Sequence, residues 1–437
     1  MGYTEETRAE AAADIDRRGD AGEERPEKGA VSTAAPRERA VLMGIESEES
    51  LEELARLTET AGAEVAGSFL QKRDKPDNAT LIGSGRLEQL RRECEELRAD
   101  VCIFDEELTG IQCRNLEQAL HIRVLDRTML ILDIFAMRAS SAEGKLQVET
   151  ALLQYRSARL TGQGIMLSRQ GGGIGTRGPG ESKLEMNRRQ IRERIAELNG
   201  RIAELEKQRG ERRKAREKNG VPTVALVGYT NAGKSTLLNA LTGSDVYVKD
   251  ELFATLDAVS RRMETPEKTE YLLVDTVGFI RKLPHTLIKA FKSTLEEAAL
   301  ADVLVIVSDG ARQDMDRQHR TVESVLEELG AVRQKRIEVI NKCDDAAPNV
   351  VIPCALPISA KTGEGLDELK KRIAEAIQET VRPAVITVPF DRYAVLNELH
   401  AQGRVLKETH TETGTEVTVL LSARDRERIL SHLSRPR

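Results

Sequence analysis

The sequence predicts an α/β protein whose several domains are arranged around one glycine-rich turn. Short apolar runs alternate with amphipathic helical stretches before residue 140 and again after residue 221. Between these two parts lies a long helical stretch with a coiled-coil repeat. A strand, a glycine-rich turn and a helix follow one another over residues 223–241. The length of 437 residues suggests about three domains.

The composition argues against several classes of protein. The chain carries 66 Lys and Arg against 72 Asp and Glu, a net charge of −6, so a nucleic-acid surface must be local. Aromatic residues make up 3% and Trp is absent, which argues against base-stacking platforms. The five cysteines form no CxxC pair, which argues against zinc and a disulfide framework.

The chain shows no targeting or membrane-spanning pattern. The acidic, polar N-terminus does not resemble a signal peptide, and no apolar run approaches the length of a membrane span. We therefore expect a soluble cytoplasmic protein, with association to a peripheral membrane fraction left open, and we expect a monomer.

The first 139 residues predict a polar leader followed by a small domain. Residues 1–39 contain almost no large apolar side chains and are expected to form a disordered tail. In residues 40–139, strands are expected at 41–45, 65–70, 101–104 and 122–125, and helices around 51–57, 87–97 and 116–120. This alternation predicts an α/β domain with a mostly parallel sheet. Its loop Gly83–Arg86 is compatible with a phosphate site and equally with a plain turn into the next helix.

Residues 140–220 predict a helical hairpin arm. Helices are expected at 143–159 and 181–218, joined by the glycine-dense stretch 162–180. In the second helix a coiled-coil seam alternates steps of four and three through Ile191, Ile195, Leu198, Ile202 and Leu205. In the first helix, facing positions seven apart are Leu146, Leu153 and Leu160.

The charge of this arm favours RNA as a partner. Residues 181–220 contain 13 Lys and Arg against 8 Asp and Glu, and no acid lies between Gly162 and Gly180. A basic arm that ends in flexible backbone suits RNA phosphates and irregular RNA shape. An interdomain linker with a solvated charged face is the alternative. The candidate RNA-binding residues are Arg169, Arg177, Lys183, Arg188 and Arg189.

The glycine-rich turn Gly228–Ser235, GYTNAGKS, fits the phosphate-binding pattern GxxxxGK[ST] between a predicted strand and helix. Gly228 and Gly233 let the backbone wrap closely around a pyrophosphate, and the helix that follows adds its positive N-terminal end. Lys234 can reach the β- and γ-phosphates, and the Ser235 hydroxyl can ligate Mg²⁺. The ordinary alternative is a glycine-rich β-turn before a helix.

Further motifs follow in the order typical of a GTP-binding domain, expected over residues 221–378. Asp275–Gly278 is a DxxG at the end of a buried strand, where Asp275 can hold Mg²⁺ through water and the Gly278 N–H can meet the γ-phosphate. Thr255 stands where a switch threonine completes the Mg²⁺ ligands. Asn341–Asp344 is an NKxD whose Asp344 can accept from the N1–H and 2-amino group of guanine.

The predicted sites can be grouped by role. The Mg²⁺ ligands are Ser235, Thr255 and Asp275, and the catalytic group comprises Lys234, Asn231, Thr255 and Gly278. The nucleotide contacts comprise Gly228, Tyr229, Thr230, Asn231, Ala232, Gly233, Lys234, Ser235, Thr236, Phe253, Ala254, Thr255, Asp275, Gly278, Asn341, Lys342, Asp344, Ser359, Ala360 and Lys361.

Two residues of this domain bear on the mechanism. Asn231 stands at the position that a group of monovalent-cation-assisted GTPases use to ligate K⁺. Phe279 follows the DxxG where Ras-like enzymes place the glutamine that orients the attacking water. Because an aromatic ring cannot polarise water, we expect unaided hydrolysis to be slow and to be stimulated by K⁺, a rearranged switch or a macromolecular partner.

The last stretch, residues 379–437, predicts a small α+β domain. Strands are expected at 385–388 and 416–421, and helices at 393–406 and 424–433. Its histidines, His400, His410 and His432, are scattered, so metal ligation is not expected.

Several longer stretches of the chain are distinctive, namely DRT with LILDIFA (126–136), EGKLQVE (143–149), GGGIGTRGPGE (171–181), LFATLD (252–257) and DTVGFIRKLPH (275–285). From residue 40 onward they give the chain a resemblance to HflX, a family of bacterial ribosome-associated GTPases. The resemblance implies an N-terminal HflX domain, a helical arm, a GTPase domain and a small C-terminal domain. It also implies binding to the large ribosomal subunit and splitting of stalled or idle ribosomes under stress, with the arm near the peptidyl-transferase region.

Two positions depart from that family, because Lys183 replaces a Gln and Asn187 replaces an Asp, which bears on local contacts of the arm.

Three hypotheses about the function remain open. The first is a GTP-driven factor that splits ribosomes. The second is an assembly factor for the large subunit that GTP times. The third is an RNA-remodelling ATPase that uses the N-terminal domain, as some family members are reported to bind ATP there, with Gly83–Arg86 as its candidate loop.

Overall fold

The structure is a computed structural model, and Glu38–Arg437 form one compact unit in it. It describes residues 37–73, 75–170, 179–218, 221–243, 252–253, 258–266, 268–282, 292–331, 334–345, 352–402, 404–411 and 413–434. The expected tail therefore lies outside the described residues up to residue 36. Its last residue, Arg39, already belongs to a strand. Among the described residues, none of the helices has both the length and the apolar character needed to cross a bilayer.

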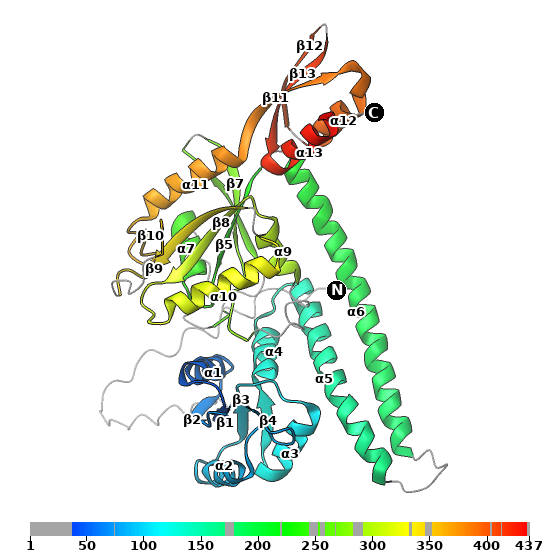
Figure 1. Cartoon of the computed structure of the whole chain (residues 1–437), viewed down its shortest axis with the longest axis vertical. Coiled ribbons are helices and arrows are strands. Elements are labelled where there is room, and N and C mark those ends of the chain that lie inside the picture. Colours follow the sequence, from blue (N-terminus) through cyan, green and yellow to red (C-terminus); the bar gives the residue numbers. More distant parts are fainter. Residues whose placement is uncertain are drawn as a thin grey trace, which may run out of the picture. The chain divides into compact units, whose positions relative to one another are not determined.

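The N-terminal domain contains the parallel sheet that the sequence predicts (Figure 1). Its order is β2-β1-β3-β4, and its strands are β1 (Arg39–Gly44), β2 (Glu64–Leu70), β3 (Val101–Phe104) and β4 (Arg123–Asp126). Its helices are α1 (Glu48–Thr60), α2 (Ser84–Glu96), α3 (Gly110–Leu120) and α4 (Arg127–Arg138). The sequence reasoning did not assign α4.

Successive side chains of β1 belong in turn to two separate hydrophobic cores. Val41 and Met43 pack with residues of α2 and α3, whereas Ala40 and Leu42 join a cluster with α1 and α4. Successive side chains of a strand point to opposite faces of the sheet, so each face receives every second residue. All four of these side chains are completely buried.

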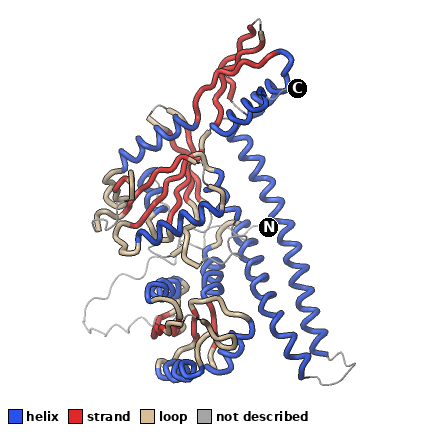
Figure 2. The backbone as a smooth tube through the Cα atoms, viewed as in Figure 1, coloured by secondary structure: helices blue, strands red, loops and turns tan. Residues whose placement is uncertain are grey.

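The arm consists of two long helices, α5 (Ala142–Gln170) and α6 (Pro179–Lys218), which run side by side in Figure 2. Leu198 of the predicted seam is fully buried. The ion pairs Arg194–Glu149 at 2.8 Å and Arg209–Glu143 at 2.9 Å cross between the helices in antiparallel register. The predicted loop 162–180 was too long, because α5 continues through Gly162 and Gly164 to Gln170. Residues 171–178 lie outside the described part.

The central domain has a six-stranded sheet in the order β10-β9-β8-β5-β7-β6, with only β6 antiparallel to its neighbour among the described strands. The strands are β5 (Thr223–Gly228), β6 (Val259–Glu264), β7 (Glu270–Asp275), β8 (Val303–Asp309), β9 (Lys335–Asn341) and β10 (Leu356–Pro357). The helices are α7 (Lys234–Thr242), α9 (Lys292–Leu300), α10 (Met315–Glu328) and α11 (Leu366–Thr380). Residues of α7 and α11 pack on one face, and residues of α9 and α10 pack on the other.

The C-terminal domain is an antiparallel sheet, order β11-β13-β12, covered by two helices. Its elements are β11 (Val381–Pro389), the short 3₁₀ turn η2 (Phe390–Arg392), α12 (Tyr393–Gln402), β12 (Arg404–Thr411), β13 (Gly414–Ser422) and α13 (Ala423–Ser434). The predicted helix 393–406 is thus wrong in its last turn, because the chain enters β12 at Arg404.

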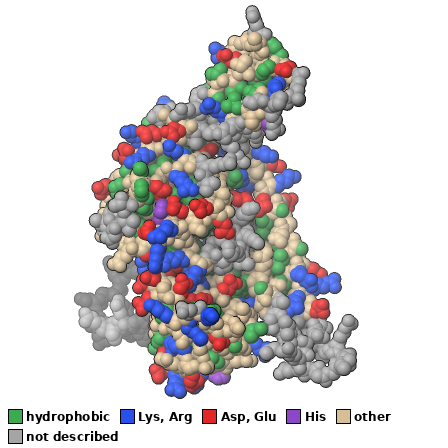
Figure 3. All heavy atoms as spheres, viewed as in Figure 1, with side chains coloured by type: hydrophobic (Ala, Val, Ile, Leu, Met, Phe, Trp, Pro, Cys, Tyr) green, Lys and Arg blue, Asp and Glu red, His purple; other side chains and the backbone are tan. Residues whose placement is uncertain are grey.

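A single apolar cluster joins the N-terminal and central domains. It contains Leu42 and Leu57 from the first domain and Val227, Phe279 and Val325 from the second. On the surface, charged side chains of both signs are mixed over the face shown in Figure 3. The internal cluster is therefore one of the contacts that hold the two domains together.

Candidate functional site

Four sequence motifs meet at one edge of the central sheet. The glycine-rich turn follows β5, the DxxG begins at the end of β7, and the NKxD begins at the end of β9. The fourth is the short stretch Ser359–Lys361, whose three residues are predicted nucleotide contacts, and it follows β10. These strands are parallel, so their carboxyl ends lie on the same side, where open α/β sheets hold their ligands. The structure therefore brings together motifs that are up to 133 residues apart in sequence (228 to 361).

Two glycines of the turn stand where a side chain has no room. A Cβ on Gly228 would lie 2.2 Å from the carbonyl oxygen of Val307. A Cβ on Gly233 would lie 2.3 Å from Nδ2 of Asn341, and Gly233 has a φ of +89°. Both positions need glycine, and the turn can follow a curve that points backbone N–H groups inward.

Lys234 and Ser235 begin α7 at the phosphate side of the site. Lys234 Nζ donates to the carbonyl oxygens of Gly228 at 3.2 Å and Tyr229 at 2.9 Å, so the ammonium lies across the turn. Burial lowers the pKa of Lys234 to about 8, and the nearby Asp275 carboxylate opposes that shift. The Ser235 hydroxyl donates to Asp275 Oδ2 at 2.6 Å. Two hard oxygen donors thus lie together beside the ammonium, a donor set that fits Mg²⁺.

The base side of the site is linked to the glycine-rich turn through Asn341. Its Nδ2 donates to the carbonyl oxygen of Ala232 at 2.9 Å, and its Oδ1 accepts the N–H of Ala360 at 2.9 Å. The carboxylate of Asp344 is exposed, and a hydrogen bond from Ser359 lowers its pKa, so Asp344 is a charged acceptor at neutral pH. Lys342 pairs with Asp309 at 2.8 Å.

The remaining predicted residues fall in three groups. Ala254, Thr255 and Arg177 lie outside the described residues. Thr236, Gly278 and Lys361 lie on the motifs at the sheet edge. The other RNA candidates lie on the arm, Arg169 on α5 and Lys183, Arg188 and Arg189 on α6, with Arg189 exposed and paired to Glu193.

Sequence reasoning missed the N-terminal residues that contact this site. The Tyr229 hydroxyl donates to the Glu53 carboxylate of α1 and accepts the N–H of Arg281 at 2.8 Å. Arg127, the first residue of α4, donates to Glu53, to Asp105 at 2.8 Å and to the carbonyl oxygen of Arg281 at 3.3 Å. No local pattern signals these contacts, because they join residues 22 to 176 positions apart.

Arg127 is the centre of a buried charge network. Its side chain is 2% exposed and that of Asp105 is 1% exposed. Burial alone would lower the pKa of Arg127, but Glu53 and Asp105 raise it, so the guanidinium stays charged. Lys282 joins the same network at 2.6 Å from Asp105. The segment that follows the DxxG is therefore bonded to the N-terminal domain by its backbone and by a side chain.

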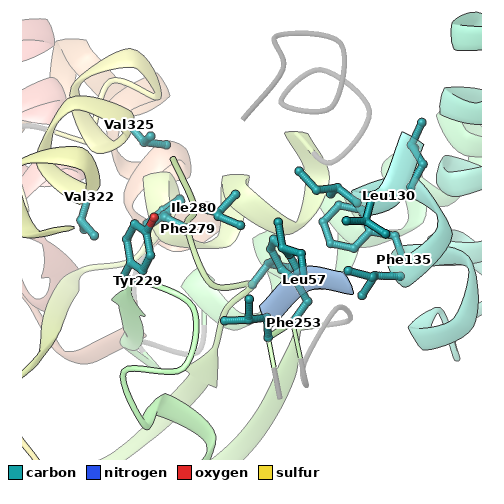
Figure 4. Packing of buried hydrophobic residues seen from close by; sticks show 14 of the residues in the cluster. Leu57, Leu130, Phe135, Tyr229, Phe253, Phe279, Ile280, Val322 and Val325 are labelled. Atoms are coloured by element: carbon teal, nitrogen blue, oxygen red, sulfur yellow. The ribbon is translucent and has the colours of Figure 1, made fainter. Parts of the chain in front are cut away.

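Aromatic packing adds a second connection between the domains. The rings of Phe253 and Phe135, from the central domain and from α4, lie 4.7 Å apart at 82°, in an edge-to-face arrangement (Figure 4). Figure 4 also shows Phe279 and Ile280 close to Tyr229 in the same cluster. Phe279 is 1% exposed, so its ring belongs to this core and not to a water-filled site.

The second phosphate candidate, Gly83–Arg86, forms the start of α2. The Arg86 guanidinium makes two hydrogen bonds to Glu93, at 3.0 and 2.8 Å, and lies over the Phe69 ring. The N–H of Gly83 donates to Gln71 at 3.3 Å. The basic group of this loop, Arg86, is already paired with Glu93, which favours a plain turn over a phosphate site.

Comparison with known families divides the chain in the same order. Residues 48–136 match a family described as the N-terminal region of a GTP-binding GTPase, and residues 138–216 match its middle region. Residues 223–342 match a family described as 50S ribosome-binding GTPase.

Individual relatives match over most of the chain. A protein named GTPase HflX from Caldanaerobacter subterraneus subsp. tengcongensis is 49% identical over 91% of this chain and 94% of its own length. GTPase HflX from Escherichia coli is 40% identical over 86% of this chain and 92% of its own. A solved complex of SsGBP with GDP is 26% identical, with a TM-score of 0.46, over 78% of this chain and 99% of that one.

The buried ammonium of Lys234 predicts that nucleotide affinity depends on pH. A lysine with a pKa of about 8 is charged below that pH, and a bound phosphate requires the charged form. We expect GDP affinity to be constant from pH 6.5 to 7.5 and about tenfold weaker at pH 9, since one pH unit above the pKa leaves roughly a tenth of the lysine charged.

Titration calorimetry in two buffers with different ionisation enthalpies measures this directly, because binding above pH 8 must take up a proton. A Lys234→Arg variant stays charged and should lose the pH dependence even if its affinity is lower. Constant affinity and no proton uptake between pH 7 and 9 would contradict the prediction.

Proposed function

Because the chain belongs to the HflX GTPase family, we propose that it binds the large ribosomal subunit as a GTP-hydrolysing factor and splits stalled or idle ribosomes under stress in the cytoplasm. The observation that carries this proposal is the position of Arg281 after the DxxG. Its N–H is bonded to Tyr229 of the glycine-rich turn, and its carbonyl to Arg127 of the N-terminal domain. A change at the nucleotide can thereby act on the domain that continues into the arm.

The phosphate side supplies charge and ligands. The Lys234 ammonium and the N–H groups of the turn would hold the β- and γ-phosphates, and the Gly278 N–H would meet the γ-phosphate. Ser235 and Asp275, whose oxygens lie 2.6 Å apart, would hold Mg²⁺ together with Thr255. That ion would neutralise the charge that develops on the transferring phosphoryl group.

The base side selects guanine over adenine. The Asp344 carboxylate would accept from the N1–H and the 2-amino group of guanine, whereas adenine offers neither donor. Ser359 orients Asp344, and Asn341 keeps the loop of Ala360 and Lys361 against the phosphate-binding turn. Lys342 would cover the purine from one side.

Slow unaided hydrolysis is part of the proposal. The ring of Phe279 is buried and carries no group that could orient water. Alignment would therefore come from K⁺ held in part by Asn231, and from the ribosome as the stimulating partner.

The arm supplies the proposed RNA contact. Its α6 helix carries exposed basic side chains such as Arg189, and it packs against α5 through buried Leu198 and paired charges. A rigid pair of helices with excess positive charge would reach ribosomal RNA by phosphate contacts. The candidates for this contact are Arg169, Arg177, Lys183, Arg188 and Arg189.

Ribosome sedimentation tests the proposal. In sucrose gradients the protein is expected to travel with large subunits in the presence of a non-hydrolysable GTP analogue and to remain free with GDP. Addition of protein and GTP to purified 70S ribosomes should convert them to subunits, and ribosomes should raise GTP turnover many-fold. Equal sedimentation with both nucleotides and no stimulation would defeat the proposal. Precursor rRNA that accumulates on depletion, without splitting activity, would favour the assembly factor instead.

The arm's share can be measured with matched variants. Replacing Arg188 and Arg189 on α6 by Ala should weaken binding to large subunits about tenfold and reduce its salt dependence. The control replaces Arg91 and Arg92 on α2, which are each paired with a glutamate of their own helix, as Arg189 is. Equal losses in both double variants would show that the effect is not specific to the arm.

Base selection predicts a change of nucleotide in one variant. Asp344→Asn replaces an acceptor by an amide that can donate to the oxygen of xanthine, so GTP affinity should fall about 100-fold or more while xanthosine triphosphate gains. Asp345→Asn, one residue further and also exposed, is the control and should leave both affinities unchanged. Retained GTP selectivity in Asp344→Asn would mean that another residue reads the base.

The K⁺ hypothesis makes turnover depend on the monovalent cation. Hydrolysis is expected to be several-fold faster in K⁺ than in Na⁺, because the smaller ion fits the same oxygen ligands poorly. Asn231→Ala should remove this difference without abolishing GDP binding. Equal rates in the two salts for the unchanged protein would leave Asn231 without a cation to hold.

A further inference from the structure

Thr230, the third residue of the glycine-rich turn, is bonded to both segments that flank the phosphate site. Its N–H donates to the carbonyl oxygen of Phe279 at 2.7 Å, and its Oγ1 accepts the N–H of Phe253 at 2.9 Å. Thr230 itself is 6% exposed. A single buried residue thus connects the segment before Thr255 with the segment after the DxxG.

The last residue of the DxxG lies directly on Thr230. A Cβ on Gly278 would come within 2.6 Å of the Thr230 Cα and 2.9 Å of its Cβ, so only glycine permits this approach. On the other side, the N–H of Phe279 donates to the carbonyl oxygen of Gly228 at 3.1 Å. Gly278 and Phe279 therefore lie along the turn, and Phe279 forms an isolated parallel β-bridge with Tyr229.

The other segment depends on Thr230 for an unusual backbone conformation. Phe253 has a φ of +54°, which residues with a side chain rarely adopt, and it is 2% exposed. Two contacts stabilise it there, the hydrogen bond from its N–H to the Thr230 hydroxyl and the packing of its ring on Phe135. Without the hydroxyl, a buried N–H would lose its partner.

We propose that Thr230 is a positioning residue that ties both segments to the phosphate-binding turn and so favours the triphosphate over the diphosphate. Its Oγ1 accepts from the N–H of Phe253 and its own N–H donates to Phe279, so we assign Thr230 an indirect effect on the nucleotide. The inference rests on the proposed function in one respect, that the two segments sense the γ-phosphate through Thr255 and Gly278. GDP lacks that phosphate, so its binding should not depend on the hydroxyl.

The test compares Thr230→Val, which replaces the hydroxyl by a methyl of similar size, with Thr230→Ser, which keeps the hydroxyl. Because Thr230 lies in the phosphate-binding turn, the decisive quantity is the ratio of two affinities, and for Thr230→Val we expect the loss for GDP to be at least fivefold smaller than the loss for a GTP analogue. Affinity for a non-hydrolysable GTP analogue and kcat/KM for GTP should fall about tenfold, the usual effect of one hydrogen bond. Thr230→Ser should restore both to within about threefold.

Every outcome decides the question. An equal loss for GDP and the analogue would make Thr230 a structural residue of the turn, and an equal loss in Val and Ser would assign the effect to packing. Unchanged or tighter analogue binding in Thr230→Val would mean that the hydroxyl does not favour the triphosphate state. Each of these results overturns the inference.

Thermal unfolding checks that each variant is folded, and if Thr230→Val is not, the comparison of Thr230→Ala with Thr230→Ser replaces it. The unchanged protein separates this inference from the proposed function. If it binds neither nucleotide, the nucleotide site itself is misassigned. If it binds both and the variants do not discriminate between them, only the inference about Thr230 fails.

Discussion

The close approach of Gly278 to the phosphate-binding turn is the constraint on which the site depends. Because Gly278 has no Cβ, the backbone of the DxxG segment can come close enough to pair with the turn. The N–H of Thr230 donates to the carbonyl oxygen of Phe279, and the N–H of Phe279 donates to the carbonyl oxygen of Gly228. This pairing fixes the direction in which the chain leaves the site. It brings Arg281 to the Tyr229 hydroxyl and Lys282 to Asp105. A glycine with no room for a side chain thus determines where the N-terminal domain meets the nucleotide site.

The buried charges between the N-terminal domain and the segment after the DxxG favour a few distinct arrangements of this contact over a continuous range of positions. The side chains of Arg127 and Asp105 are almost completely buried and that of Glu53 is 13% exposed, and removing one partner of such a network costs about 3–5 kcal/mol because a charge is left unpaired. Small shifts of Arg281 would lengthen its bond to Arg127 without giving the guanidinium another partner. We infer that the segment and the N-terminal domain move together or not at all, as bistable packed interfaces do.

The sequence predicted the parts that obey local rules and missed those that depend on distant residues. The turn at Gly228–Ser235 was predicted from its glycines and the GxxxxGK[ST] pattern, and the strand and helix beside it from the pattern of their apolar residues. The α4 helix was missed because apolar residues run from Met129 to Met137 with only Asp133 between them, and Leu130, Ile131 and Phe135 are all buried, so no clear amphipathic period shows. Its local signal was Asp126, whose side chain accepts from Met129 as an N-cap. The helix ending at Gln402 had its own signal in Gly403, which directly follows it.

The contacts of Tyr229 and Phe279 could not be read from their motifs, and they change how the motif is interpreted. On its own, an aromatic residue after the DxxG indicates only that the water-orienting glutamine of Ras-like enzymes is absent there. In the fold, the same ring fills a core shared with the N-terminal domain, so the position is used to join domains. A residue committed to that core cannot also align water. Under the proposed function the alignment comes from K⁺ and from the ribosome, and a partner that binds the N-terminal domain would act on the same packed segment.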